Sequence, residues 1–176
     1  VDDGNITYNI VTSSSNSTDA TYHDLNVADV DVANSDDDST GFSLSTVSGL
    51  TTSEAGGNST FTVALLSEPT AGVTVSLTSS DSREGFTSPE SIVFTDKNWS
   101  TAQTVTVTGG NDYIDDDDKG YTINVSASSN DPTYSVLSDA SVSVTNSDDD
   151  VAGYTVSGTS GLVTTEAGGD LSLIHI

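Results

Sequence analysis

The chain repeats itself at a fixed interval. The segment SEAGG at 53–57 returns as TEAGG at 165–169, and SGL at 48–50 returns at 160–162, in both cases 112 residues further on. Self-similarity at such a period indicates consecutive copies of one structural unit. The fold must therefore fit within about 112 residues and be able to follow itself along one chain.

The repeat also indicates where each copy begins and ends. VDDGNITYNI at 1–10 aligns with IDDDDKGYTI at 114–123 at an offset of 113, so a one-residue insertion or deletion lies between the copies. This alignment predicts one complete repeat at 39–150. It also predicts the C-terminal part of a preceding repeat at 1–38 and the N-terminal part of a following repeat at 151–176.

Apolar residues alternate with polar ones in short runs throughout the complete repeat, which is the pattern of β-strands. Thr, Val, Ile and Tyr dominate the runs, and Gly, Asp, Asn, Ser and Pro fill the gaps between them. The predicted strands are 41–46, 60–66, 72–79, 91–95, 102–109, 120–128 and 140–146. We therefore expect tandem immunoglobulin-like antiparallel β-sandwiches of about seven strands each, without the cysteine pair of antibody domains.

The charge of the chain restricts its partners. There are 27 acidic residues against three Lys and Arg, which gives a net charge of −24. Such a chain repels nucleic acid and anionic membranes, and no stretch approaches the roughly 20 apolar residues of a membrane span. We expect neither nucleic-acid binding nor membrane insertion, and we expect the chain to attract cations.

The aspartates are concentrated in loops rather than spread over the sequence. Of the 22 Asp, 13 belong to four short clusters. These clusters are Asp2 and Asp3; Asp36, Asp37 and Asp38; Asp112 with Asp115, Asp116, Asp117 and Asp118; and Asp148, Asp149 and Asp150. Clustering of this kind favours local binding over general solubility, although a lone acidic run is most often a solvated loop.

The predicted topology brings the acidic loops of the complete repeat together. The loop holding Asp112 and 115–118 precedes the sixth predicted strand, and 148–150 follow the seventh, which runs antiparallel to the sixth. The Glu54 loop can reach the same pole, so nine carboxylates can converge there. Two charges 6 Å apart repel by roughly 3 kcal/mol at an effective dielectric constant near 20, so cations must fill the gap or the loops must splay into water. Oxygen-only ligands from flexible loops suit Ca²⁺ better than Mg²⁺ or Zn²⁺.

Three segments in this order resemble the Calx-beta family of β-sandwich domains. They are TSEAGGNSTFTVAL at 52–65, GGNDYIDDDDKGYTINV at 109–125 and SVSVTNSDDD at 141–150. A further stretch, VFTDKNWSTAQTVTVTG at 93–109, resembles tandem repeats of large bacterial surface proteins. The plain Asp run departs from the family, which often has Glu in this loop.

The resemblance implies a calcium site and a location. Matching positions imply Glu54, Asp112, Asp116 and 148–150 as ligands of the complete repeat. They imply Asp2, Asp3 and 36–38 in the preceding repeat and Glu166 in the following one. We therefore expect a structural, extracellular or cell-surface Ca²⁺-binding repeat, in which ions at domain junctions stiffen an adhesin stalk or filament made of neighbouring repeats or further copies.

Two alternatives have less support in the sequence. One is a carbohydrate- or ligand-binding sandwich that uses Trp99 to bind a surface glycan or protein, although Trp99 is expected to pack at a strand edge. The other is a binding module attached to a secreted enzyme whose catalytic domain lies elsewhere. The chain itself shows no catalytic constellation, because both of its His residues lie outside the complete repeat, and His23 is replaced by Ser135 in the next copy. We expect no enzyme activity, and we expect Tyr22 and Tyr134, also 112 residues apart, to be core residues.

Overall fold

The computed structural model describes residues 1–156 and 160–168, and their regular structure is almost entirely β. Two strands precede the complete repeat, β1 (Ile6–Ile10) and β2 (Val30–Asn34). Nine strands follow within the repeat: β3 (Phe42–Leu44), β4 (Leu50–Ser53), β5 (Asn58–Leu65), β6 (Val73–Ser79), β7 (Gly85–Ser88), β8 (Ser91–Phe94), β9 (Gln103–Gly109), β10 (Lys119–Ser129) and β11 (Ala140–Ser147). A short 3-10 turn at Tyr134–Val136 joins β10 to β11.

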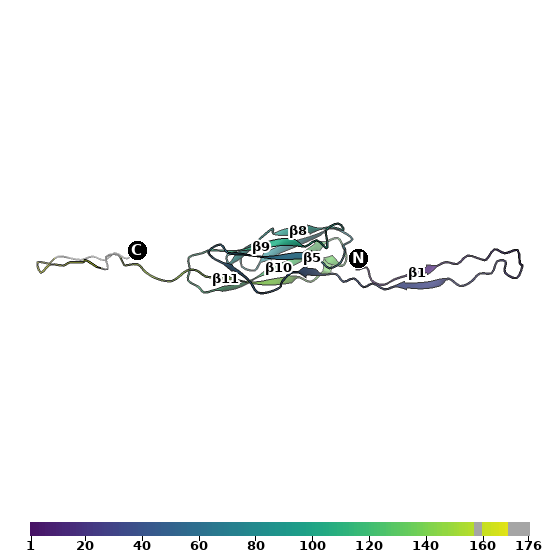
Figure 1. Ribbon diagram of the computed structural model, residues 1–176, viewed down its shortest axis with the longest axis horizontal. Coiled ribbons are helices and arrows are strands. Elements are labelled where there is room, and N and C mark those ends of the chain that lie inside the picture. Colours follow the sequence, from purple (N-terminus) through teal and green to yellow (C-terminus); the bar gives the residue numbers. More distant parts are fainter. Residues whose placement is uncertain (157–159, 169–176) are drawn as a thin grey trace.

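The nine strands form the expected β-sandwich. One sheet has the order β4-β11-β10-β6-β8 and the other β3-β5-β9-β7. All pairs are antiparallel except β4 and β11, which run parallel with Ser53 opposite Ser147. Figure 1 shows the sandwich in the middle of an elongated molecule, with the β1–β2 hairpin extending from one end and the segment after β11 leaving the other.

The core lies between the two sheets and follows the period-two pattern. Val73, Val75 and Leu77 of β6 point inward, as do Tyr121, Ile123 and Val125 of β10, while the residues between them are less buried. Valine dominates the fully buried positions because alternating β-branched residues fill the narrow space between two sheets.

Two strands of the complete repeat, β4 and β7, were not predicted from the sequence. β4 reads LTTS and carries one strongly buried residue, Thr52, so it shows no apolar alternation. β7 reads GFTS and is likewise four residues long, with the exposed Phe86 on its outer side. The predicted strand at 41–46 is shorter than expected and is confined to β3. The repeat thus has nine strands where seven were predicted.

The β1–β2 hairpin reproduces the β10–β11 hairpin. Ile6 pairs with Asn34, as Lys119 pairs with Asn146 one repeat later. Tyr8 and Ile10, which correspond to the buried Tyr121 and Ile123, are about half exposed because residues 1–38 supply no second sheet. Ile10 and Tyr8 therefore lie on what is the core face in the complete repeat.

The two tyrosines expected in the core differ for the same reason. Tyr134 is 1% exposed, and its hydroxyl donates to the Ser67 carbonyl over 2.7 Å. Tyr22 is 61% exposed, so its prediction was wrong for this chain. It lies in the turn of the isolated hairpin, where no sandwich covers it.

Local geometry also recurs after the complete repeat. Gly49 and Gly161 both have positive φ, at 81° and 74°, and so do Gly56 and Gly168, at 84° and 89°. The amides of the second pair donate to Ser53 and Thr165 over 3.0 and 3.1 Å. The division of the chain into repeats stays a prediction, and residues 157–159 and 169–176 of the last part lie outside the described residues.

A glycine ahead of the acidic loop gives a test of the packing. A Cβ on Gly110 would lie 1.7 Å from the Arg83 carbonyl oxygen, whereas a Cβ on Gly120 would meet nothing within 4 Å. We expect Gly110→Ala to cost about 3 kcal/mol and to lower the melting temperature by on the order of 10 °C. Gly120→Ala is the matched control, and thermal denaturation of both variants is the measurement. Equal melting temperatures would contradict the close approach of Gly110 to Arg83.

Candidate metal centre

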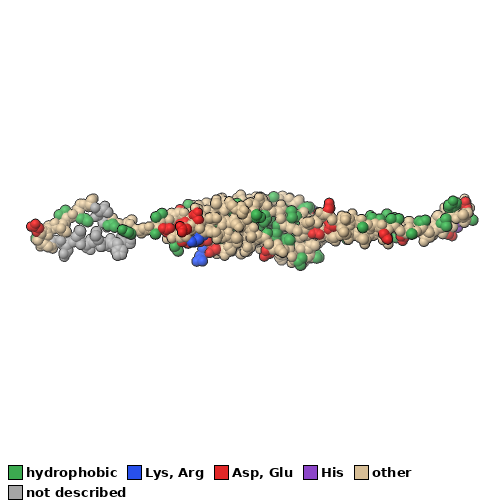
Figure 2. All heavy atoms as spheres, turned by 90° about the horizontal axis from the view of Figure 1, so that it is seen from below, with side chains coloured by type: hydrophobic (Ala, Val, Ile, Leu, Met, Phe, Trp, Pro, Cys, Tyr) green, Lys and Arg blue, Asp and Glu red, His purple; other side chains and the backbone are tan. Residues whose placement is uncertain are grey.

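The acidic elements of the complete repeat meet at the end of the sandwich where β4 and β11 stop. Ser53 lies opposite Ser147 in a parallel pair, so Glu54 and Asp148 leave the sheet side by side. Lys119 pairs with Asn146, which brings the loop before β10 to the same end. Acidic side chains are gathered at both ends of the sandwich in Figure 2, and basic ones lie beside one of these clusters.

Glu54 is the centre of this cluster. Its side chain is buried, at 4% exposure for the residue, and its Oε2 atom has no hydrogen-bond partner among the described residues. One carboxylate oxygen from each of Glu54, Asp148 and Asp150 lies within 4.8 Å of the other two. The Oδ2 atom of Asp150 is likewise buried without a partner. Two of the three clustered residues thus have a buried carboxylate oxygen without a hydrogen bond.

The electrostatics of the three carboxylates differ. Burial raises the pKa of Glu54, and the charges of Asp112, Asp148, Asp150 and Asp116 raise it further. Burial also raises the pKa of Asp150, and the charge of Asp148 raises it further. In contrast, the backbone N–H of Asp150 holds the pKa of Asp148 below its usual value. Without a cation, Glu54 and Asp150 therefore bear the repulsion of the cluster.

The acidic loop divides into inward and outward residues. Asp116 has a buried Oδ1 atom without a partner and an Oδ2 atom 3.6 Å from Lys119 Nζ. Asp112 accepts from the Ile114 N–H over 2.7 Å, and its charge acts on Glu54. The charges of both residues act on Glu54, and their predicted role as metal ligands stays a prediction.

The other aspartates of this loop have partners of their own. Asp115 accepts from the Ala152 N–H over 2.6 Å, and Asp118 accepts from the Ser147 hydroxyl over 3.0 Å. Asp117 has a positive φ of 66° and an exposed side chain. Asp149 is also exposed. The predicted role of these four as metal ligands stays a prediction.

The acidic residues of the preceding repeat are arranged in the same way. Asp36 accepts from the N–H groups of Asp3 and Gly4 over 3.0 and 2.6 Å. Asp148 accepts from Asp116 and Asp117 over 3.0 and 2.9 Å. Asp2 is half-buried, and Asp37 and Asp38 are exposed. Residues 1–38 contain no counterpart of Glu54, so this cluster lacks its central carboxylate.

Glu166 lies in the turn Glu166–Gly168, which corresponds to the turn that begins at Glu54. It is exposed, because the described part of the following repeat contains no strand that could bury it. Its predicted role as a ligand stays a prediction.

Glu84 joins the site although the sequence did not single it out. It lines a pocket of about 260 Å³ together with Asp112, Asp116 and Lys119. Its Oε2 atom lies 3.4 Å from Nδ2 of the buried Asn146, which also donates to the Gly110 carbonyl over 2.9 Å. The signal that could have found Glu84 is strand β7, since a strand beginning at Gly85 places Glu84 at this pole.

A buried aspartate at the other end of the repeat is not part of a comparable site. Asp131 is 2% exposed and accepts five hydrogen bonds, from Thr70, Thr133 and Tyr134. Burial opposes its ionisation, but these bonds outweigh burial and hold its pKa far below the usual value. Because its oxygens are satisfied, Asp131 serves to fix the loop.

Trp99 packs against the core cluster and is half-buried, and its carbonyl accepts from Leu65 over 2.8 Å. This matches the expected packing role. Residues 1–156 and 160–168 include no helix with the length and apolarity that crossing a membrane requires.

No family model and no curated protein matches the chain. Among solved structures it is similar to the E. coli chaperone DraB, with 12% identity over 65% of this chain and 59% of that chain and a TM-score of 0.45. It is also similar to WR4, a C. elegans MSP family member, with 14% identity, coverage of 61% and 96%, and a TM-score of 0.41. Domains 4 and 5 of the S-layer protein SbsC give 17% identity, coverage of 68% and 59%, and a TM-score of 0.42.

The chain thus spans about three fifths of the length of the chaperone. At these identities and TM-scores the likeness identifies no relative and says nothing of function. The fold assignment rests on the two sheets themselves.

Proposed function

We propose that this chain is part of a structural, non-catalytic array of Calx-beta-like repeats that bind Ca²⁺ outside the cell. In this proposal the ions stiffen the junctions between repeats of an adhesin stalk or extracellular filament. The partners are neighbouring repeats or further copies, and a surface glycan or protein is a further class of partner for the whole array.

The observation that carries the proposal is the unpaired carboxylate of Glu54. A buried charged group without a hydrogen bond is costly, because it has lost water and gained nothing in return. Here it faces Asp148 and Asp150 within 4.8 Å instead of a donor. A divalent cation among the three oxygens would replace this repulsion with attraction.

The donor set favours calcium. All candidate groups are oxygens, and they come from three separate loops, which suits the flexible geometry of 6–8 oxygen ligands around Ca²⁺. Mg²⁺ demands a stricter octahedron, and Zn²⁺ prefers His or Cys ligands, which this cluster lacks. Glu54, Asp112, Asp116, Asp148 and Asp150 would hold the ion, with Glu84 beside them.

The position of the cluster supports a role at the junction. Only two residues separate Asp150 from Gly153, which corresponds at the offset of 112 to Gly41, the start of the first predicted strand. An ion bound by Asp148 and Asp150 would therefore restrict the linker directly. The corresponding linker of the preceding repeat, after Asp38, is equally short.

The proposal is tested by melting the whole chain in Ca²⁺, in Mg²⁺ and in EDTA. Extracellular calcium modules bind at about 10⁻⁴–10⁻³ M. At a hundredfold excess over the dissociation constant, one site adds about 2.7 kcal/mol of stability. We expect a higher melting temperature in 10 mM Ca²⁺ than in EDTA and a smaller rise in Mg²⁺. Identical melting curves in all three would refute the site.

The effect of Ca²⁺ is also expected to depend on pH. Because the pKa values of Glu54 and Asp150 are raised, the folded metal-free protein binds more protons at these two carboxylates than the unfolded chain does. In EDTA, stability should therefore fall as the pH rises above 4.5, the usual Glu value. Protons compete with Ca²⁺ for the same oxygens, so its stabilising effect should shrink as the pH falls from 7 towards 4.5. A calcium effect independent of pH over this range would exclude these two carboxylates as ligands.

A further inference from the structure

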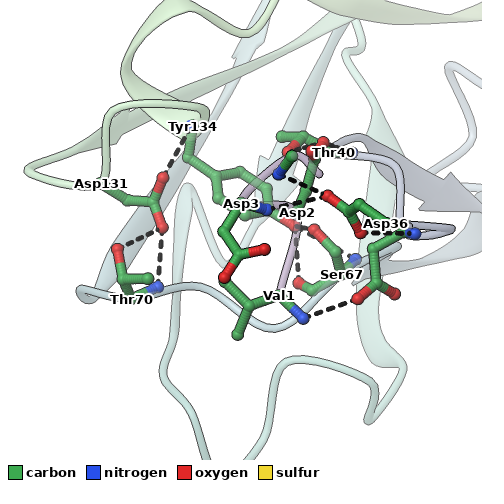
Figure 3. A network of polar contacts seen from close by, with 11 residues as sticks. Val1, Asp2, Asp3, Asp36, Thr40, Ser67, Thr70, Asp131 and Tyr134 are labelled. Carbon is green, nitrogen blue, oxygen red and sulfur yellow. Dashed lines mark hydrogen bonds and ion pairs between the residues drawn. The ribbon is translucent and has the colours of Figure 1, made fainter. Parts of the chain in front are cut away.

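The segment that leads from one repeat into the next is held by an aspartate of the acidic loop. Asp2 Oδ2 accepts from the Thr40 N–H over 2.7 Å and from the Thr40 hydroxyl over 2.7 Å. Thr40 directly precedes Gly41, the first residue of the predicted strand at 41–46. Figure 3 shows Asp2 and Thr40 in contact at the junction between the hairpin and the sandwich.

The same bond exists at the second junction. Asp115 Oδ2 accepts from the Ala152 N–H over 2.6 Å. Asp115 corresponds to Asp2 at the offset of 113, and Ala152 corresponds to Thr40 at the offset of 112. The two bonds thus occur at equivalent places although Ala152 has no hydroxyl, so the shared element is the backbone amide.

The surrounding backbone is shared as well. Asp38 N–H donates to Asp36 over 3.0 Å, and Asp150 N–H donates to Asp148 over 2.8 Å. The residue two positions after Asp2, and likewise after Asp115, has a positive φ: 73° at Gly4 and 66° at Asp117. A recurring set of bonds of this kind indicates a built junction rather than a chance contact.

Little else ties the two parts together at the first junction. Asp2, Asp3 and Gly4 face Thr70 and the 131–133 turn across a cleft of about 530 Å³. The hydrogen bonds of Asp2 to Thr40 are the ones that link residues 1–38 to the sandwich among the described residues. The direction in which the hairpin meets the sandwich therefore depends on the linker and its bonds.

We propose that Asp2 and Asp115 are linker clamps, which bind the backbone amide of the residue entering the following repeat and thereby set the orientation of that repeat. A hydrogen bond to a carboxylate is about twice as strong as one between neutral groups, which suits a bond in an exposed place. The clamp consists only of a carboxylate oxygen and a backbone N–H, so no metal ion is one of its members. Asp2 and Asp115, the first aspartates of their loops, would thus bind the next repeat and not the cation.

The test uses amide hydrogen exchange of the whole chain by NMR in EDTA, so that calcium binding plays no part. We expect the amides of Thr40 and Ala152 to exchange at least about tenfold more slowly than in an unstructured chain. Asp115→Ala should remove the protection of Ala152 and leave that of Thr40, and Asp2→Ala should do the reverse. Asp115→Asn keeps an acceptor oxygen and should retain part of the protection.

The matched controls are Asp149→Ala and Asp37→Ala, which remove one charge from the same clusters at exposed positions. Both should leave the two amides protected. The proposal is overturned if either amide of the parent protein exchanges at the unstructured rate, or if Ala152 stays protected in Asp115→Ala. It is also overturned if Asp149→Ala exposes Ala152 as much as Asp115→Ala does, since the effect would then be one of charge alone.

Discussion

Replacing Glu54 with glutamine is expected to stabilise the metal-free protein and to weaken calcium binding by on the order of 10–100-fold. Glutamine keeps the shape of the side chain but removes the charge that burial and four aspartates oppose. Metal sites lose 10–100-fold in affinity even when a group that only supports a ligand is removed, so a central ligand should cost at least as much. The two effects have opposite signs and follow from one carboxylate.

The measurement is thermal unfolding in EDTA together with calorimetric titration by Ca²⁺. In EDTA at pH 7 the variant should melt above the parent, and in saturating Ca²⁺ it should melt below. Glu90→Gln makes the same substitution at an exposed position and should change neither. A variant that melts below the parent in EDTA would mean that the Glu54 charge is satisfied in the metal-free protein, contrary to its burial without a hydrogen-bond partner.

Calcium is expected to protect the peptide bond after Lys119 from enteropeptidase by roughly a hundredfold. The segment DDDDK at 115–119 is the recognition sequence of this protease. Cleavage requires an extended segment, but Lys119 pairs with Asn146 and the amides of Asp116 and Asp117 are bound to Asp148. If cleavage follows the population of the open loop, about 2.7 kcal/mol of calcium stabilisation corresponds to this protection.

The cleavage rates are compared in Ca²⁺ and in EDTA, with an unrelated substrate as control for the calcium dependence of the protease. Glu54→Gln should reduce the protection, although Glu54 lies far from Lys119 in sequence, because both are at one pole of the sandwich. Equal rates in Ca²⁺ and EDTA would show that the loop is only a solvated acidic run.

The sandwich could be predicted from the sequence because its central strands show a clear alternation of apolar and polar residues. Val73, Val75 and Leu77 alternate with polar residues, and the same holds for Tyr121, Ile123 and Val125. β4 and β7 were missed because four residues are too few for alternation to be seen. Their place in the sheets is decided by pairing with β11 and β9, which no local pattern reveals.

The candidate site was predicted in outline for a similar reason. Antiparallel pairing of β10 and β11 brings Asp116 and Asp148 to one pole whatever the detailed register. The parallel pairing of β4, which buries Glu54 beside Asp148, could not be read from the sequence. The sequence of the acidic loop also does not reveal which aspartates turn inward. Asp115 and Asp116 are identical neighbours, yet Asp115 accepts from the Ala152 N–H and Asp116 has a buried oxygen without a partner.

The most direct test of the calcium proposal is a crystal structure grown in 10 mM Ca²⁺, with anomalous scattering used to locate the ion. We expect an anomalous peak between Glu54, Asp148 and Asp150, with carboxylate oxygens at about 2.3–2.6 Å from it. We also expect the Glu54 side chain to stay buried. A structure under these conditions with no peak at this pole, and with the three carboxylates turned out into water, would contradict it.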